Sequence, residues 1–172
     1  EFRRVLFRSV IEASKFLRKG SKIKILLIGH GNQESNLKRQ VVGLENIEVL
    51  PAVSDEDYSA LLAAADLLLV NERPTQMDMS LPSKLTSYLF SDRPVLAAVP
   101  RGGATWKYLE GIAELVEADN PRALANMIYQ LSENHVRREE LSRLGLEFAR
   151  SNLDAEKGRA RYLQWVEELL ED

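Results

Sequence analysis

Residues 81–89 read Leu-Pro-Ser-Lys-Leu-Thr-Ser-Tyr-Leu, and residues 93–97 read Arg-Pro-Val-Leu-Ala. Pro82 has the fixed φ angle that suits the first position of a helix, and Ser83 can satisfy a donor of the first turn. Apolar side chains then recur at helical spacing, at Leu85, Tyr88 and Leu89. The stretch therefore predicts a helix that begins at the Pro-Ser-Lys triplet.

The start of this helix is typical of an anion-binding site. Its first amide N–H groups have no partner within the helix, the helix dipole adds partial positive charge, and Lys84 adds a full charge. The apolar runs 66–70 and 94–98 indicate buried parallel strands, so the helix start faces the carboxyl edge of the sheet, where open α/β folds bind ligands. We expect a diphosphate there. Taken alone, the helix also fits a surface helix with a solvated lysine.

Composition excludes several classes of protein. The chain has 172 residues, 45% of them hydrophobic, which suits one domain with a sizeable core. Its net charge of −3 is spread evenly, so we expect no nucleic-acid partner. With no cysteine and only two, widely separated histidines, we expect neither a disulfide nor a metal site. Apolar runs fall well short of the ~20 residues of a membrane span, and no signal peptide appears, so a soluble, cytoplasmic protein is expected.

The first nine residues, Glu-Phe-Arg-Arg-Val-Leu-Phe-Arg-Ser, match the translation of a common short-read sequencing adapter. We therefore predict that residues 1–9 are an artefact and that the native domain occupies residues 10–172, with an unknown length missing upstream. A native, basic amphipathic start is the alternative.

The rest of the chain alternates between short strands and helices. Helices are predicted over residues 10–19, 34–42, 55–65 and 105–109, and strands over residues 22–28, 47–50, 66–70, 94–98 and 112–116. From Pro121 the pattern is helical to the end. This alternation predicts an α/β fold with a Rossmann-like parallel sheet flanked by helices, followed by a helical C-terminal tail.

A second candidate segment is the turn Gly29-His30-Gly31, which lies between a predicted strand and a predicted helix. Its glycines let the backbone approach a phosphate, and His30 either contacts the ligand or is a solvated loop residue. Because the third glycine of the dinucleotide fingerprint is missing and no Gly-Lys-Ser/Thr follows, the turn favours neither an NAD enzyme nor a P-loop. Glu72 and Arg73, in the loop before the Pro-Ser-Lys helix, are placed to reach the edge of the cleft. No catalytic residue is identified.

Three runs carry a family resemblance: Ala-Ala-Asp-Leu-Leu-Leu-Val at 64–70, the Pro-Ser-Lys-Leu-Thr stretch at 81–89, and Arg-Pro-Val-Leu-Ala at 93–97. Together they resemble the C-terminal, nucleotide-sugar-binding domain of a GT-B glycosyltransferase of family 4, most of all its colanic-acid and exopolysaccharide branch. The segments 112–116 and 120–124 are similar to the closing part of that domain. The resemblance begins near Val10 and continues to the end of the chain.

The resemblance implies a retaining, hexosyltransferase-type enzyme that moves a sugar from a nucleotide sugar to a polysaccharide or lipid-linked acceptor without a metal or other cofactor. Residues 29–31 would lie near the phosphates or the sugar. The nucleotide sugar would also be bound by Pro82, Ser83, Lys84, Leu85 and Ser87. Of these, Ser83, Lys84 and Leu85 would donate to the diphosphate. The acceptor domain and the first strand of this domain would lie upstream of Val10, so the fragment would be inactive. Any contact with the inner face of the membrane would be made through that missing half.

The sequence departs from the family pattern in two places. Many relatives carry two glutamates eight residues apart, and here Met79 and Ser87 stand at those positions. Asp92 replaces the usual glycine before Arg-Pro. Two alternatives remain open at this point: a non-catalytic Rossmann-like binding module and a GT-B-fold sugar-nucleotide epimerase.

Overall fold

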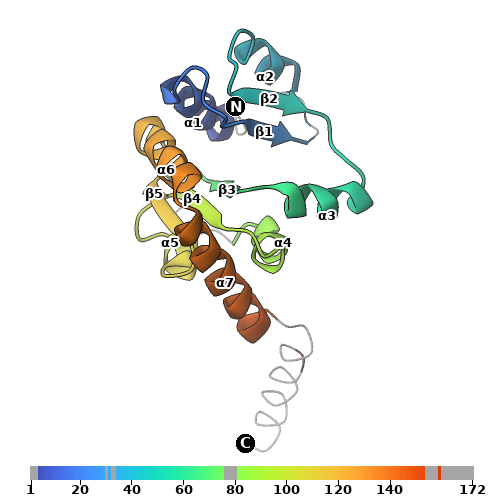
Figure 1. Ribbon diagram of the computed structural model, residues 1–172, viewed down its shortest axis with the longest axis vertical. Coiled ribbons are helices and arrows are strands. Elements are labelled where there is room, and N and C mark those ends of the chain that lie inside the picture. The colour runs from blue at the N-terminus through green and yellow to red at the C-terminus, as the bar shows by residue number, and fades with distance from the viewer. Residues whose placement is uncertain (1–3, 30, 32–33, 76–80, 154–158, 160–172) are drawn as a thin grey trace, which may run out of the picture.

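The computed structural model describes residues 4–29, 31, 34–75, 81–153 and 159 (Figure 1). Within these residues the chain is a mixed α/β fold of alternating helices and strands, as predicted. The elements are, in order, α1 (Arg4–Phe16), β1 (Ile25–Ile28), α2 (Glu34–Gln40), β2 (Ile47–Leu50), α3 (Asp55–Ala64), β3 (Leu68–Asn71), α4 (Lys84–Phe90), β4 (Val95–Val99), α5 (Ala104–Leu109), β5 (Glu114–Glu117), α6 (Pro121–Glu133) and α7 (His135–Asn152).

The described strands form two sheets, and every pairing is parallel. β1 pairs with β2 in register Ile25 to Ile47. The second sheet has the order β3-β4-β5, in which β4 is central and buried along its whole length. A parallel strand covered on both faces carries a continuous apolar run, which is why residues 95–99 could be recognised as a strand from the sequence.

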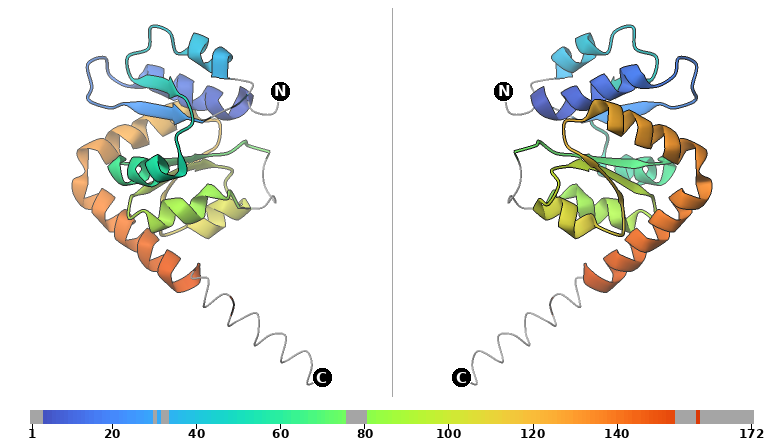
Figure 2. Two further views of the ribbon diagram at one scale, coloured as in Figure 1. Left: turned by 90° about the vertical axis from the view of Figure 1, so that its right-hand side faces the viewer. Right: turned by 90° about the vertical axis from the view of Figure 1, so that its left-hand side faces the viewer.

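Helices cover the two faces of the three-stranded sheet (Figures 1 and 2). On one face, α1 and α6 form a core with Leu96, Ala98 and Val116. On the other face, α4, α5 and α7 pack on Val70 and on the alternate residues of β4. Because successive side chains of a strand point to opposite faces, β4 contributes to both cores. The result is the layered parallel architecture predicted from the sequence, with α6 and α7 as its helical C-terminal region.

Helix ends follow the sequence in most places but not at α4. Ser54 caps α3 by accepting from the N–H of Asp57, as its place before an acidic first turn indicates. Asn120 caps α6 in the same way. Ser83, in contrast, has helical backbone angles and makes no capping hydrogen bond. The expectation that its side chain satisfies a first-turn donor is wrong for this structure, because a capping side chain needs an extended backbone at that residue.

Several predicted bounds also shift. α1 begins at Arg4 and ends at Phe16, whereas the prediction covered residues 10–19. β1 is confined to residues 25–28. Neither shift tests whether residues 1–9 are native. The predicted terminal helix beyond residue 159 lies outside the described residues. Among the described helices, none is long and apolar enough to cross a membrane.

Candidate functional site

The Pro-Ser-Lys helix start lies at the carboxyl edge of the three-stranded sheet. β3 and β4 are parallel neighbours, and α4 runs back between them, so its first residue, Lys84, is on the side where both strands end. α5 connects β4 to β5 in the same way, and its start lies at the same edge. The end of β3 and the starts of two helices therefore meet at one place, which is where ligands bind in open parallel sheets.

Glu72 is buried at this edge. It follows the last residue of β3, its N–H donates to the carbonyl oxygen of Ala98, and only 5% of it is exposed. Thr105, in the first turn of α5, donates its hydroxyl to Oε1 of Glu72 at 2.7 Å. Burial raises the pKa of the Glu72 carboxyl, while the Thr105 hydrogen bond and the charge of Lys84 act to lower it. The predicted cleft-edge acid is thus a buried group that ties β3 to α5.

Lys84 provides an exposed cation beside this buried carboxylate. Desolvation by the surrounding protein lowers the pKa of Lys84, and the Glu72 carboxylate acts in the opposite direction. The ammonium lies 5.9 Å from the centre of the Tyr88 ring, one turn further along α4. Burial raises the pKa of Tyr88 to about 12, with a smaller contribution from Tyr58, so that phenol is neutral at physiological pH. The cluster of Glu72, Thr105 and Lys84 therefore presents one positive group at its surface.

Other groups of the Pro-Ser-Lys stretch are already engaged. The N–H of Leu85 donates to the carbonyl oxygen of Pro82 at 3.0 Å, and the Ser87 hydroxyl donates to the carbonyl oxygen of Lys84 at 3.2 Å. Both are local bonds within the first turns of the helix. A diphosphate at this edge would therefore rely on the Lys84 ammonium first.

The glycine turn lies at the end of the other sheet. Gly29 follows β1, has a φ of 151° that side chains rarely adopt, and donates its N–H to the carbonyl oxygen of Leu50. The carbonyl oxygen of Gly31 accepts from the N–H of Glu34, which starts α2. His30 lies outside the described residues. Across the described ranges, no hydrogen bond or ion pair joins this turn to α4.

Arg73 is the other residue predicted to reach the edge of the cleft. It directly follows Glu72 and is half-buried.

Sequence reasoning missed Thr105 as a member of the cluster. The available signal was topological: a helix that follows a buried strand after a glycine turn must also start at the carboxyl edge. Gly102 has a φ of 75°, and the chain turns there from β4 into α5. The same argument that selected Lys84 at the start of α4 thus applies to Thr105 in the first turn of α5.

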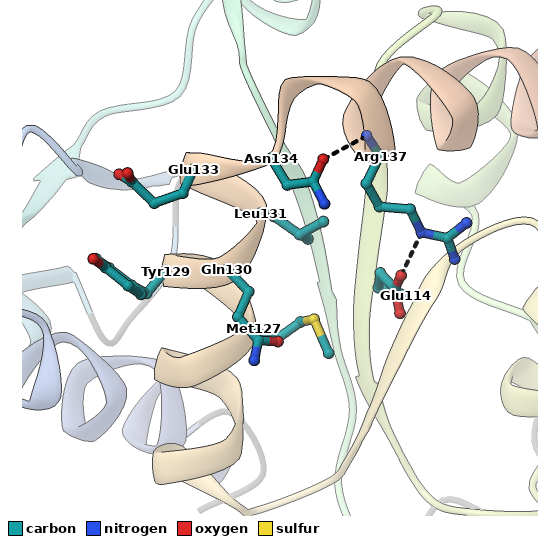
Figure 3. Close-up of a pocket in the computed structure, with 8 residues that line it drawn as sticks. All are labelled: Glu114, Met127, Tyr129, Gln130, Leu131, Glu133, Asn134 and Arg137. Atoms are coloured by element: carbon teal, nitrogen blue, oxygen red, sulfur yellow. Dashed lines mark hydrogen bonds and ion pairs between the residues drawn. The ribbon is translucent and has the colours of Figure 1, made fainter.

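A cavity of about 560 Å³ lies elsewhere, against α6 (Figure 3). It is lined by Glu114, Met127, Tyr129, Gln130, Leu131, Glu133, Asn134 and Arg137. Glu114 is the first residue of β5, so this cavity lies at the amino edge of the sheet. The cavity is therefore on the opposite edge from the cluster of Glu72, Thr105 and Lys84.

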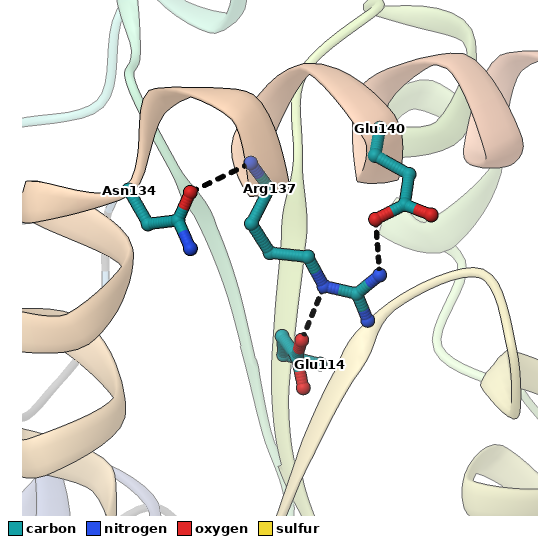
Figure 4. A network of polar contacts seen from close by, with 4 residues as sticks. All are labelled: Glu114, Asn134, Arg137 and Glu140. Carbon is teal, nitrogen blue, oxygen red and sulfur yellow. Dashed lines mark hydrogen bonds and ion pairs between the residues drawn. The ribbon is translucent and has the colours of Figure 1, made fainter.

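The guanidinium of Arg137, which lines that cavity, is paired with carboxylates of the protein itself (Figure 4). Its Nε donates to Glu114 at 2.7 Å, its Nη1 donates to Glu140 at 2.6 Å, and its own N–H donates to the Asn134 side chain. Both hydrogen bonds raise the pKa of Arg137, the one to Glu140 more than the one to Glu114. Arg137 thus joins the start of β5 to the junction of α6 and α7.

Within the described ranges, no group of three or more His, Cys, Asp or Glu side chains is arranged to hold a metal ion.

Comparison with known proteins adds to this geometry. The family model described as "Glycosyl transferases group 1" matches residues 5–134. A search of curated protein sequences found no match. Among solved structures, this chain is similar to Anabaena Alr3699/HepE in complex with UDP-glucose, with 19% identity, a TM-score of 0.76 and coverage of 94% of this chain and 44% of that one.

Two further structures are similar. The glycosyltransferase from Rickettsia africae has 17% identity and a TM-score of 0.79, over 100% of this chain and 46% of that one. The catalytic domain of the cholesterol-α-glucosyltransferase from Helicobacter pylori has 19% identity and a TM-score of 0.69, over 84% and 88% of the two chains. The chain thus spans less than half the length of the Anabaena and Rickettsia proteins.

Proposed function

The chain belongs to the group 1 family of glycosyl transferases, and from that premise we propose that it is the donor-binding half of a retaining glycosyltransferase. The proposed reaction moves a hexose from a nucleotide sugar to a polysaccharide or lipid-linked acceptor, as in the exopolysaccharide branch of family 4. The observation that carries the proposal is that Lys84, an exposed residue, stands at the carboxyl edge of the parallel sheet and interacts electrostatically with the buried Glu72. The Anabaena neighbour in complex with UDP-glucose supports the class of donor.

In this proposal, Lys84 acts on the leaving group. When the bond between the sugar and the nucleoside diphosphate breaks, negative charge grows on the diphosphate oxygens. A fixed ammonium and backbone N–H groups at the start of α4 stabilise that charge, and they need no metal to do so. Glu72 and Thr105 hold the end of β3 against α5, so the edge on which Lys84 sits is rigid before the nucleotide arrives. A positioned charge of this kind costs little reorganisation during the reaction.

The acceptor side belongs to a part of the protein outside this chain. Because the chain covers only 44% and 46% of two neighbouring structures, we assign acceptor binding to an N-terminal domain. The donor half would work in the cytoplasm, and contact with the inner face of a membrane would come from the N-terminal domain. Under this proposal the chain alone binds a nucleotide sugar and transfers nothing.

The test is an NMR titration of the chain with UDP, GDP and ADP. We expect saturable shifts at residues 83–85 and 29–31, with a dissociation constant near 1 mM, which corresponds to about −4 kcal/mol. Lys84→Ala should weaken binding by about 1–2 kcal/mol, because it removes a charge-assisted contact.

The matched control is Lys107→Ala, since Lys107 is an exposed lysine on α5 whose loss changes the net charge equally. If both variants weaken nucleotide binding equally, the effect comes from the net charge of the chain and not from a contact made by Lys84. A folded chain that binds none of the three nucleotides would contradict the proposal and favour a non-catalytic binding module.

A further inference from the structure

We propose that Glu72 takes up a proton when a diphosphate binds at Lys84, and that Thr105 is a positioning residue that sets the pH range of this uptake. The proton comes from the solvent and neutralises the Glu72 carboxylate. The edge of the sheet then does not hold two negative groups that share one lysine. This inference rests on the proposed function, because it concerns the same diphosphate site.

The Glu72 carboxyl is held in place by the fold itself. The N–H of Glu72 donates to the carbonyl oxygen of Ala98 at 2.9 Å, which extends the pairing of β3 with β4 by one residue. Its side chain accepts from the Thr105 hydroxyl at 2.7 Å. Since Val70 and Glu72 are two residues apart on an extended segment, both point to the face that α4 and α5 cover (Figure 2). The carboxyl therefore lies between the sheet and the starts of these two helices.

The surroundings of this carboxyl do not balance a full negative charge. Glu72 is 5% exposed and Thr105 is 3% exposed, so the hydrogen bond between them is shielded from water. Among the described residues, Thr105 is the one side chain that hydrogen-bonds to Glu72, and none forms an ion pair with it. One hydroxyl does not compensate the desolvation of a carboxylate. Burial accordingly raises the pKa of Glu72.

Few charged groups lie on the elements around this carboxyl. β4 offers none, because residues 95–99 are all apolar. α5 carries Lys107 in its last turn, and Arg73 directly follows Glu72 in the chain. α4 carries Lys84 at its start, and this is the charge that lowers the pKa of Glu72. The ionised form of Glu72 thus depends on Lys84.

A bound diphosphate would use the same charge. Its negative groups reduce the favourable potential that Lys84 creates at Glu72, so the pKa of Glu72 must rise on binding. A group whose pKa rises on binding takes up a proton in that step, and the binding weakens at pH values at which the unbound protein has already lost the proton. We therefore expect the affinity for a diphosphate to fall as the pH rises through the pKa of Glu72.

The experiment measures UDP-glucose binding to the chain by NMR titration at several values between pH 5 and pH 8.5. UDP-glucose is a suitable probe because both ends of its diphosphate are esterified, so its charge stays constant over this range. Glu72→Gln is the comparison, since its amide is neutral and can still accept from Thr105. The two proteins should approach equal affinity toward pH 5, and the parent should bind about threefold to tenfold more weakly at pH 8.5. Titration of Lys84 affects both proteins and cancels in this ratio.

Variants of Thr105 test its positioning role. Its hydroxyl favours the charged form of Glu72, so Thr105→Val should move the change in affinity to higher pH. Thr105→Ser keeps the hydroxyl and should restore the parent profile. A merely structural role would alter the affinity equally at every pH. Glu110→Gln is the matched control, because it removes one exposed carboxylate at the far end of α5 and should leave the profile unchanged.

The carboxyl carbon of Glu72 gives a direct measurement in the parent protein, which decides the matter even if a variant does not fold. Its ¹³C shift, followed against pH with and without saturating UDP-glucose, should show a higher pKa in the complex. An unchanged pKa, or an affinity ratio to Glu72→Gln that is the same at every pH, overturns this inference alone. A folded chain that binds no UDP-glucose at any pH overturns the proposed function, and this inference with it.

Discussion

Glu72 is a carboxyl group that the fold buries at a cost. Burial raises its pKa above the ordinary value of 4.5. A carboxyl with a higher pKa in the folded than in the unfolded chain favours folding while it is protonated, and this contribution is lost as the pH rises through the folded-state pKa. We therefore expect Glu72→Gln, which stays neutral and can still accept from Thr105, to be more stable than the parent chain at pH 8. The advantage should shrink toward zero near pH 4.5.

Thermal unfolding of both proteins from pH 4.5 to pH 8 measures this difference, and an advantage that is independent of pH would contradict it. Thr105→Val is the companion variant. Thr105 supplies the hydrogen bond that favours the charged form of Glu72, so its loss should raise the pKa of Glu72 further. It should also lower the free energy of unfolding at pH 8 by about 1–2 kcal/mol.

These residues also define how far sequence could predict the site. Lys84 was recognisable because proline, serine and lysine at a helix start form a local pattern. The bond between Glu72 and Thr105 joins residues 33 positions apart, and no local pattern encodes it. The prediction that Glu72 reaches the edge of the cleft likewise carried no information on its burial, which depends on the packing of α5 against β3. His30 lies outside the described residues, so its role remains a prediction.

Among the helices, the close contact of α4 with α7 depends on a glycine. A Cβ at Gly145 would lie 3.2 Å from Cδ2 of Leu89, which is 1% exposed and cannot move into solvent. Gly145→Ala should therefore destabilise the parent chain, despite a helix-propensity gain of about 1 kcal/mol. In a Leu89→Ala background, which itself should cost about 2–5 kcal/mol, the new methyl enters the cavity and the sign should reverse.

Urea unfolding of the two single variants and the double variant gives the coupling between these positions. We expect a coupling of more than about 0.5 kcal/mol in favour of the double variant. Additive effects would mean that α7 shifts to relieve the contact, and that Gly145 does not set the distance between the two helices.

The junction of α6 and α7 rests on Arg137. Arg137→Met should lower the free energy of unfolding by about 1–2 kcal/mol, because it leaves the partly buried Glu114 without its hydrogen-bonded partner. Arg143→Met removes an exposed i,i+4 pair with Glu147 on the same helix and should cost at most about 0.5 kcal/mol. Urea unfolding distinguishes the two variants, and equal losses would show that the contact with Glu114 contributes nothing beyond an exposed pair.

The type and order of the elements were predictable, because buried strands such as residues 95–99 and the Ser54-capped helix carry strong local patterns. The division into two sheets was not. Which strands pair depends on the tertiary fold. The sequences of β1 and β3 alone do not tell whether each strand has one neighbouring strand or two. The sequence therefore predicts a parallel sheet, and only the structure locates its interruption.

For the whole molecule, the proposed function makes the carboxyl edge of the sheet one wall of a cleft, and the proposed chemistry needs a second wall. A sugar bound at the edge beside Lys84 is reactive only when an acceptor is held against it, since positioning two reactants accounts for much of an enzymatic rate. The chain matches 44% of the Anabaena protein with bound UDP-glucose. Under the proposed function, we therefore expect the chain alone to bind UDP-glucose without turning it over.

Two measurements on one sample test this separation of binding from transfer. Under the proposed function, UDP-glucose at ten times its dissociation constant should raise the free energy of unfolding by roughly 1.4 kcal/mol, visible as a higher melting temperature. In the same sample, release of UDP should not exceed the rate without protein. The full-length gene product is the control, and it should release UDP once its acceptor is supplied. Release by the chain alone would mean that the edge beside Lys84 contains the whole catalytic apparatus, because water would then be activated without a second domain.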